Sequence, residues 1–181
     1  MTFRSFFYNS IITFSILLSL PGNLLALATD RDQPINLEAD TADIDDLKGI
    51  SIYTGNVILT QGSMVIKSEK LTLYNDKNKD LEKAIAVDHN KLARFKQRPE
   101  GKTHDFKAKA TTLIYYIKKE EIHLLENARV EQEDGSFSGH KIIYDTKKET
   151  VVASGKKDKQ GKPISSSGRV KVTIPPKKKP Q

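Results

Sequence analysis

Apolar and polar residues alternate along most of this chain, in a motif that occurs four times. Each copy opens on an apolar, a polar and a small residue and leads into a further alternation that usually ends near a tyrosine. The four copies begin at Ile35, Ile66, Phe106 and Phe137, and in the first copy the apolar-polar-small triplet is residues 37–39 (LEA). Successive side chains of a β-strand point to opposite faces, so an alternation of period two predicts a strand with one apolar face. The pattern therefore predicts β-strands along most of the sequence.

The segments between these copies are repeated as well. Residues 55–61 (GNVILTQ) and residues 126–132 (ENARVEQ) match without a gap at an offset of 71 residues. Two strands per unit of roughly thirty to forty residues are typical of a repeat architecture in which each unit covers the next. We therefore expect a stack of antiparallel hairpins. Its two open ends and its inner face are the places to look for function.

Four segments need separate interpretation. Residues 79–87 could form a helix, although their Ala-Ile-Ala-Val end is equally compatible with a strand. The acidic run 43–46 is interpreted as a solvated turn, and the sequence Asp-Arg-Asp at 30–32 as a solvated N-terminal lead. The last predicted strand covers residues 169–174, where apolar residues alternate with basic and polar ones.

One face of the predicted strands collects the apolar residues and is assigned to the interior. A single sheet would leave this face in water, whereas two facing sheets bury it, so the predicted fold class is all-β, a sandwich or jelly roll. The interior positions include Ile35, Leu37, Val57, Leu59, Ile66, Phe95, Phe106, Leu113, Tyr115, Ile117, Phe137 and Tyr144.

The N-terminal residues have the pattern of an export signal. Arg4 precedes an apolar run at 11–20, a Pro-Gly pair follows, and Ala26-Leu27-Ala28 supplies the small residues that a signal peptidase accepts. We expect cleavage after Ala28. The alternative is an uncleaved anchor, but the apolar run is shorter than the roughly 20 residues that span a bilayer.

Composition and charge exclude several classes of function. The chain has no cysteine, which excludes disulfides, thiol catalysis and cysteine-type zinc sites. The net charge is +7, and residues 156–181 carry nine basic residues against one acidic residue, while the remainder is close to balance. This basic end indicates either contact with an anionic partner or, for the tail 175–181, a solvated extension that protects the last strand. Nucleic acid is not expected as a partner, because the basic residues lack interleaved aromatics for base stacking.

No catalytic or metal-binding arrangement is evident. The four histidines, at positions 89, 104, 123 and 140, lack the close spacings that metal ligation favours. The sequence also has no glycine-rich phosphate loop and no nucleophile motif. We therefore expect no metal, no cofactor and no enzymatic activity.

Three segments carry a resemblance to a known family. Residues 32–40 (DQPINLEAD), residues 53–62 (YTGNVILTQG) and residues 139–144 (GHKIIY) resemble the OstA-like family, and the likeness extends over residues 29–174. The chain departs from the family at Glu126-Asn127-Ala128, where T-G-N-A is common. This departure weakens a turn and leaves the apolar pattern intact.

The resemblance implies an open, twisted, V-shaped antiparallel β-jelly roll in the periplasm. Its apolar groove would shelter the lipid A acyl chains of lipopolysaccharide, while the sugars and phosphates stay in water. All twelve interior positions named above then become candidate lipid-binding residues. Ile35, Leu37, Phe95, Tyr115 and Ile117 are the strongest candidates, although packing in the core is an equally good explanation for each.

The terminal strands are expected to carry assembly, because a sheet edge offers unpaired backbone groups to a further strand. The resemblance implies an inner-membrane-anchored transport component at the N-terminal edge, the N-terminal domain of an outer-membrane translocon at the C-terminal edge, and head-to-tail self-association. The predicted edge residues are Pro34, Ile35, Leu37, Val170, Val172 and Ile174. The alternatives are the membrane-anchored sister component, a periplasmic enzyme acting on envelope glycans, and a β-repeat scaffold without lipid.

Overall fold

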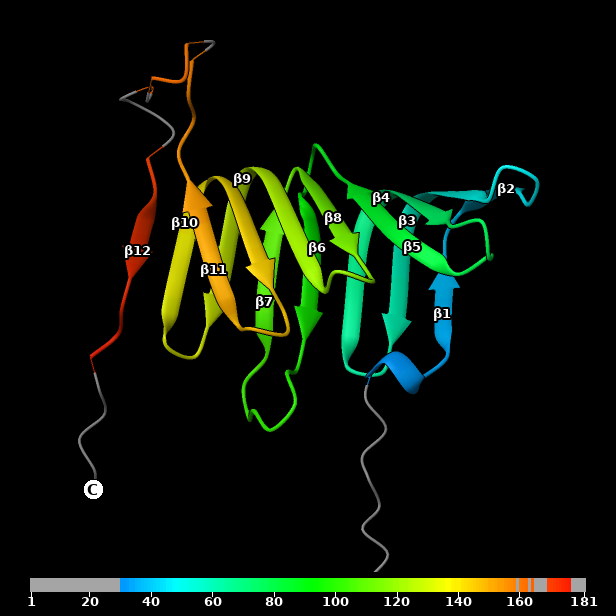
Figure 1. Ribbon diagram of the computed structural model, residues 1–181, viewed down its shortest axis with the longest axis horizontal. Coiled ribbons are helices and arrows are strands. Elements are labelled where there is room, and N and C mark those ends of the chain that lie inside the picture. The colour runs from blue at the N-terminus through cyan, green and yellow to red at the C-terminus, as the bar shows by residue number, and fades with distance from the viewer. Residues whose placement is uncertain (1–29, 159, 163, 165–168, 177–181) are drawn as a thin grey trace, which may run out of the picture.

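The computed structural model describes residues 30–158, 160–162, 164 and 169–176 (Figure 1). The expected signal segment 1–28 and residues 177–181 of the expected tail lie outside the described residues. Within them, twelve strands form one hydrogen-bonded sheet, and a short 3-10 helix, η1 (Asp30–Asp32), precedes the first strand. No helix in the described part of the chain is long and apolar enough to cross a membrane.

The strands follow one another along the chain with short connections, except before the last. They are β1 (Ile35–Glu38), β2 (Thr41–Asp45), β3 (Ile50–Gln61), β4 (Met64–Asn75), β5 (Leu81–Val87), β6 (Ala93–Gln97), β7 (Phe106–Ala110), β8 (Thr112–Tyr116), β9 (Glu121–Gln132), β10 (Gly135–Asp145), β11 (Thr150–Ser154) and β12 (Lys171–Thr173).

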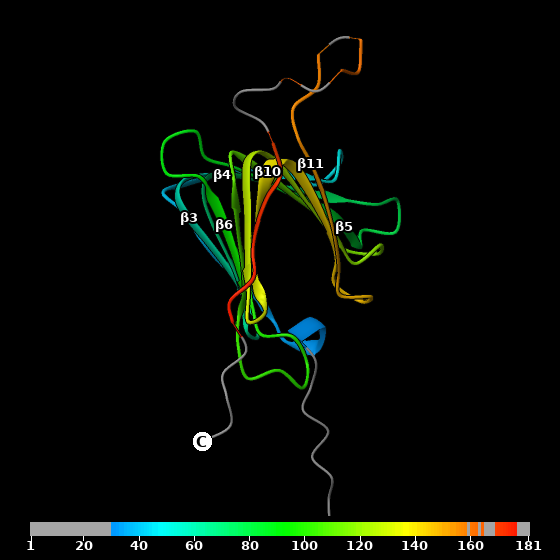
Figure 2. The ribbon, with the colours of Figure 1, turned by 90° about the vertical axis from the view of Figure 1, so that its left-hand side faces the viewer.

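Four long strands fold this sheet over on itself. Each of β3, β4, β9 and β10 pairs with different neighbours along its two parts, so each belongs to two facing layers. The first half-sheet contains β1, β6, β7 and β12 with one part of each long strand, and the second contains β2, β5, β8 and β11 with the other part. Figure 2 shows the two half-sheets facing each other and spreading apart on the side where η1 lies.

Left-handed residues produce the bends in two of the long strands. Gly55 and Asn56 in β3 have φ values of 83° and 48°, and Glu126 and Asn127 in β9 have values of 62° and 54°. These pairs occupy the same places in the two repeated runs, so the sequence repeat is also a repeat of the bend. The ladder between β3 and β4 shifts register between Thr54 and Val57, as expected where a strand is bulged.

The bend in β9 carries a glutamate where the bend in β3 carries glycine. A left-handed conformation costs an ordinary residue roughly 1–2 kcal/mol. We therefore expect Glu126→Gly to raise the free energy of unfolding by about 1 kcal/mol, because glycine removes this strain. Urea denaturation would measure the change. Glu82→Gly, at an exposed position inside β5, is the matched control and should destabilise; a loss of stability in both variants would contradict the prediction.

The core lies between the two half-sheets. Twenty buried apolar residues form one cluster, and four aromatic rings cross it. Phe95 and Phe106 come from the first half-sheet, and Tyr115 and Tyr144 come from the second. The Phe95 and Tyr115 rings meet edge to face at 6.2 Å, and the Phe106 and Tyr144 rings stack at 4.0 Å. Aromatic contacts therefore join the two layers directly.

The all-β expectation is confirmed, with four corrections of detail. Residues 81–87 form a strand, β5, and not a helix. Three residues of the acidic run 43–46 lie in β2, so that interpretation as a turn is wrong for them. The last strand is limited to Lys171–Thr173 and is shorter than the predicted 169–174. Finally, the two facing layers belong to one hydrogen-bonded sheet, because each long strand runs through both layers. In β3 and β9 the ladder shifts register at the left-handed residues.

Candidate functional site: an apolar interior with a strapped mouth

The interior opens along one side of the stack, where turns of the two half-sheets face each other. We call this opening the mouth. A cavity of about 780 Å³ lies there, between residues 61–64 and 97–106 of the first half-sheet and residues 115–120 and 144–149 of the second. Met64, Phe106, Tyr115 and Tyr144 form its apolar floor, and charged side chains of both signs form its rim. A lipid with an apolar part and a polar part would find both environments at this place.

The helix η1 is anchored to the first half-sheet through Asp30. Its carboxylate accepts hydrogen bonds from the backbone N–H of Ser63 at 2.6 Å and from the Ser63 hydroxyl at 2.7 Å. It also accepts one from the Gln97 side-chain amide at 2.8 Å. These donors belong to the β3–β4 turn and to the end of β6. Asp30 therefore fixes η1 to one side of the mouth.

The neighbouring Arg31 contacts the opposite side of the mouth. Its guanidinium donates a hydrogen bond to the carbonyl oxygen of Ile117 at 2.8 Å and pairs with the Glu120 carboxylate at 2.7 Å. Both partners lie in the β8–β9 turn of the second half-sheet. The η1 residues Asp30–Asp32 thus form a strap across the mouth, and the expectation of a solvated N-terminal lead is wrong. Lys102 and Glu149, 3.1 Å apart, make a second polar bridge between the half-sheets.

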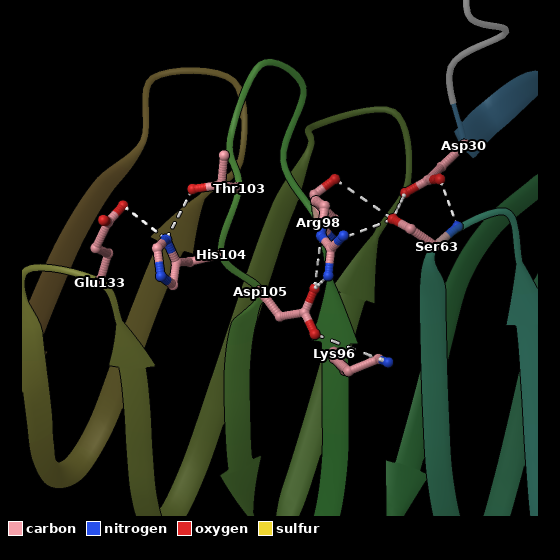
Figure 3. A network of polar contacts seen from close by, with 8 residues as sticks. All are labelled: Asp30, Ser63, Lys96, Arg98, Thr103, His104, Asp105 and Glu133. Carbon is pink, nitrogen blue, oxygen red and sulfur yellow. Dashed lines mark hydrogen bonds and ion pairs between the residues drawn. The ribbon is translucent and has the colours of Figure 1, made fainter.

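Polar contacts also hold the rim of the first half-sheet in place (Figure 3). The Arg98 side chain donates to Asp105 at 2.8 and 3.0 Å, and its backbone N–H donates to the Ser63 hydroxyl at 3.0 Å. The hydrogen bond from Arg98 lowers the pKa of Asp105 below its usual value. His104 and Glu133 lie 3.1 Å apart across the neighbouring turns. The strap residue Asp30 is therefore attached to a rim that is itself held in place by hydrogen bonds and ion pairs.

Burial raises the pKa of both tyrosines on the cavity floor, Tyr115 and Tyr144. Removal from water raises the pKa of Tyr144 to about 12, from its ordinary value of 10.0. Between pH 10 and pH 12 the unfolded chain loses this proton while the folded protein keeps it. The stability contributed by neutral Tyr144 is therefore present below pH 10 and is lost as the pH rises through about 12.

We expect the free energy of unfolding to decline more steeply with pH in the wild-type protein than in a Tyr144→Phe variant over this alkaline range. Phenylalanine keeps the ring stack with Phe106 and has no proton to lose. Urea denaturation at a series of pH values would measure both slopes. Equal slopes would show that the Tyr144 hydroxyl ionises as it does in water.

The structure places most candidate lipid-binding residues in the packed core. The fully buried candidates are Val57, Leu59, Ile66, Phe95, Phe106, Leu113, Tyr115 and Tyr144. Leu37, Ile117 and Phe137 are half-buried against this cluster, and Ile35 is 43% exposed at the N-terminal end. The structure thus gathers eleven of the twelve around one interior and leaves Ile35 outside it. Their contact with lipid remains a prediction.

Sequence reasoning missed the residues that cross the mouth. Asp30 and Arg31 carry no signal of their own, because their partners lie at least thirty residues away in the chain. No group of three or more potential metal ligands occurs among the residues that the structure describes. His104 and His123 each contact a glutamate instead.

Half-buried apolar side chains also lie toward both ends of the stack. Those that pack on the core include Leu37 on the edge strand β1, Val151 and Ala153 on the edge strand β11, and Phe137 on β10, next to the edge strand β12. Leu37, Val151 and Ala153 have a neighbouring strand on one side only. The apolar interior therefore continues to each end of the molecule.

Fold and site together define a class of protein: a folded-over β-sheet whose apolar interior opens along one side and continues to both ends. Comparison with known proteins identifies the family within that class. The chain belongs to the family described as LptA/(LptD N-terminal domain) LPS transport protein, whose model matches residues 36–150.

Individual relatives agree with this assignment. Lipopolysaccharide export system protein LptH of Pseudomonas aeruginosa is 38% identical over 157 residues, which are 87% of each chain. Lipopolysaccharide export system protein LptA of Haemophilus influenzae is 32% identical, and the match covers 81% of this chain and 85% of the relative. Lipopolysaccharide export system protein LptA of Escherichia coli K12 is 30% identical, and the match covers 83% of this chain and 80% of the relative.

A solved structure also has the same fold. The crystal structure of LptH, described as the LptA-homologous periplasmic component of the lipopolysaccharide transport device of Pseudomonas aeruginosa, superposes with a TM-score of 0.71 at 35% identity. The match covers 82% of this chain and all of that one.

Proposed function

We propose that this protein is a periplasmic lipopolysaccharide carrier with the open β-jelly-roll architecture. The acyl chains of lipid A lie between the half-sheets, and the sugars and phosphates extend through the mouth into water. The observation that carries the proposal is the apolar interior, which opens along one side and continues to both ends of the stack. The family and its relatives named for lipopolysaccharide export support the same conclusion.

Burial alone provides enough free energy for this binding. Each methylene group removed from water contributes about 0.8 kcal/mol, so several acyl chains bind without any covalent step. The cavity of about 780 Å³ is small for several chains, and the interior behind it is filled by side chains. Loading therefore requires the half-sheets to move apart and the strap to release at least one side.

The proposed path runs along the stack from one membrane to the other. An inner-membrane-anchored component of the transport system binds at β1, and the N-terminal domain of the outer-membrane translocon binds beyond β12. Further copies of the chain join head to tail between them. Backbone groups at these edges supply the pairing, since β1 and β12 each have one described neighbour, β3 and β10 respectively.

The direct test is mass spectrometry of solvent extracts from protein purified out of a lipopolysaccharide-producing cell. Lipid A in the extract, absent from extracts of a periplasmic protein of unrelated fold, would support the carrier. A clean extract would favour a scaffold without lipid. Sequencing the N-terminus of the mature protein separates the carrier from its membrane-anchored sister, because only the sister retains residues 1–28.

Stacking can be tested at the last strand. Val172 pairs with Phe137 in the β10–β12 ladder and is half exposed. Proline at position 172 removes a backbone donor and fixes φ, so Val172→Pro should abolish head-to-tail association and leave the upstream sheet folded. Light scattering over a concentration series should show rising mass for the wild type alone. Lys109→Ala, at an exposed position of the mid-stack strand β7, is the control. Equal masses for wild type and Val172→Pro would show that β12 does not carry the contact.

A further inference from the structure

The two ends of the stack carry opposite charge. Residues 30–46, which contain η1, β1 and β2, include seven acidic residues and one basic residue. The described residues between 155 and 176, at the other end, include five basic residues and one acidic residue. Charge of this kind on an exposed surface steers the approach of a partner with the opposite sign.

Several of these charges have no partner within the described molecule. Asp43 on β2 and Asp46 in the following turn are exposed, and no described cation pairs with either. Lys156 and Lys157, which follow β11, are likewise exposed and form no described ion pair. The side chains on both ends are thus available to a second molecule.

The exposed apolar side chains have the same distribution. In the described part of the chain, every exposed large aliphatic residue lies at one of the two ends. Ile35, Ile44 and Leu47 lie at the N-terminal end, and Val152, Val170, Val172 and Ile174 at the C-terminal end. Leu47, at the tip of the β2–β3 turn, is fully exposed beside the unpaired Asp46, and Lys48 on its other side pairs with Asp45. Apolar residues beside unpaired charges are typical of a protein-binding surface.

Topology then matches one end to the other. The edge strands of the first half-sheet are β1 and β12, and those of the second are β2 and β11. Figure 1 shows β1 and β2 at one end of the long axis and β11 and β12 at the other. When two copies lie head to tail with their half-sheets continuous, the acidic β2 of one faces β11 of the next and the lysines that follow it. The exposed Ile44 and Leu47 then belong to the same junction as the exposed Val152.

We propose that β2 and the β2–β3 turn of one copy dock against β11 and residues 155–158 of a second copy. This contact is separate from the β1–β12 pairing and rests on the proposed head-to-tail stacking. The charges fix the order of the copies, because acidic ends repel acidic ends and basic ends repel basic ends. They also make association dependent on ionic strength.

Charge reversal tests the contact. Asp43→Lys/Asp46→Lys and Lys156→Glu/Lys157→Glu should each weaken self-association about tenfold at about 0.05 M salt, by sedimentation equilibrium. Mixing the two variants, or combining all four changes in one chain, should restore association. Lys67→Glu/Lys109→Glu, on exposed mid-stack positions, is the matched control and should associate as the wild type does. Circular dichroism and urea denaturation establish that each variant is folded.

Cysteine pairing identifies which ends meet. The chain has no native cysteine, so Leu47→Cys and Lys156→Cys can be placed in separate molecules. Oxidation of the mixture should give a disulfide-linked dimer, whereas neither variant alone should give more than a Lys67→Cys control.

The possible outcomes separate this inference from stacking itself. Association that is equally strong at about 0.05 and about 0.5 M salt, with the reversed variants unaffected, would overturn the charge contact and leave β1–β12 stacking in place. A wild type that is monomeric at low salt would overturn both. The Lys156→Glu/Lys157→Glu variant is also tested for binding to phosphatidylethanolamine vesicles that contain lipopolysaccharide. If this variant alone loses vesicle binding while its self-association is unchanged, the basic end binds lipid phosphates instead.

Discussion

A reducible bridge between positions 31 and 120 should stop lipid from entering or leaving this protein. Arg31 and Glu120 pair at 2.7 Å across the mouth, and the absence of cysteine makes Arg31→Cys/Glu120→Cys a clean pair for a short bis-methanethiosulfonate reagent. A lipid with its chains inside and its sugars outside passes through the mouth at every point of its path. A strap held across the mouth therefore blocks side entry and also blocks sliding along the stack.

We expect almost complete loss of lipopolysaccharide uptake in the bridged protein, with recovery after reduction by dithiothreitol. Uptake and onward transfer would be measured with photo-reactive lipopolysaccharide and a second copy as acceptor. The matched control joins Lys67→Cys to Arg94→Cys, which face each other within the first half-sheet and leave the mouth free. Normal uptake and transfer in the bridged protein would show that the strap does not lie on the lipid path.

Truncation of Phe95 should destabilise the protein more than any exposed substitution. Its side chain is 2% exposed and contacts the Phe106 ring at 6.0 Å and the Tyr115 ring at 6.2 Å, edge to face in both cases. Phe95→Ala removes those contacts and leaves a void between the half-sheets, which typically costs about 3–5 kcal/mol. Ile35→Ala, at the exposed end of the stack, should cost about 0.5 kcal/mol or less.

Urea denaturation of lipid-free protein would give both values. The comparison also separates the two roles that the sequence left open for Phe95. A cost of less than about 1 kcal/mol would show that the interior is loosely filled at this point, as a permanent lipid groove would be. A large cost means that acyl chains enter only when packed side chains give way.

The strands were largely predictable because alternation is a local property. In β7, for example, Phe106, Ala108 and Ala110 alternate with two lysines. The structure buries these three residues and exposes both lysines, Lys107 and Lys109. The repeated run at 55–61 and 126–132 also predicted a repeated structural feature. In the structure this feature is the bend in β3 and in β9. The sequence could not show that β3 continues through the left-handed pair Gly55 and Asn56, where the ladder with β4 shifts register.

Other features depended on partners distant in the sequence. The acidic residues of β2 suggested a turn, and they form a strand because Ile50–Thr54 of β3 pairs with them along one edge. Residues 79–87 had no decisive period, and β5 takes its conformation from β4 and β8 on its two sides. The strap depends on Ser63 and Glu120, so its three charged residues resemble any solvated segment until the fold brings those groups together.

The order of strands in the sheet has a consequence for how the molecule is made. Along the stack the neighbours run β1, β3, β4, β5, β8, β9, β10 and β11, so the sequence order is also the spatial order. A chain that emerges N-terminus first from a ribosome or a secretion channel can therefore complete each layer before the next one appears, as repeat proteins do when structure spreads from neighbour to neighbour. Each finished layer then presents an open edge that serves as the template for the following hairpin. By the same logic, a chain with one more repeat would have a longer interior and the same cross-section, so the length of the molecule can change in evolution without any redesign of its mouth.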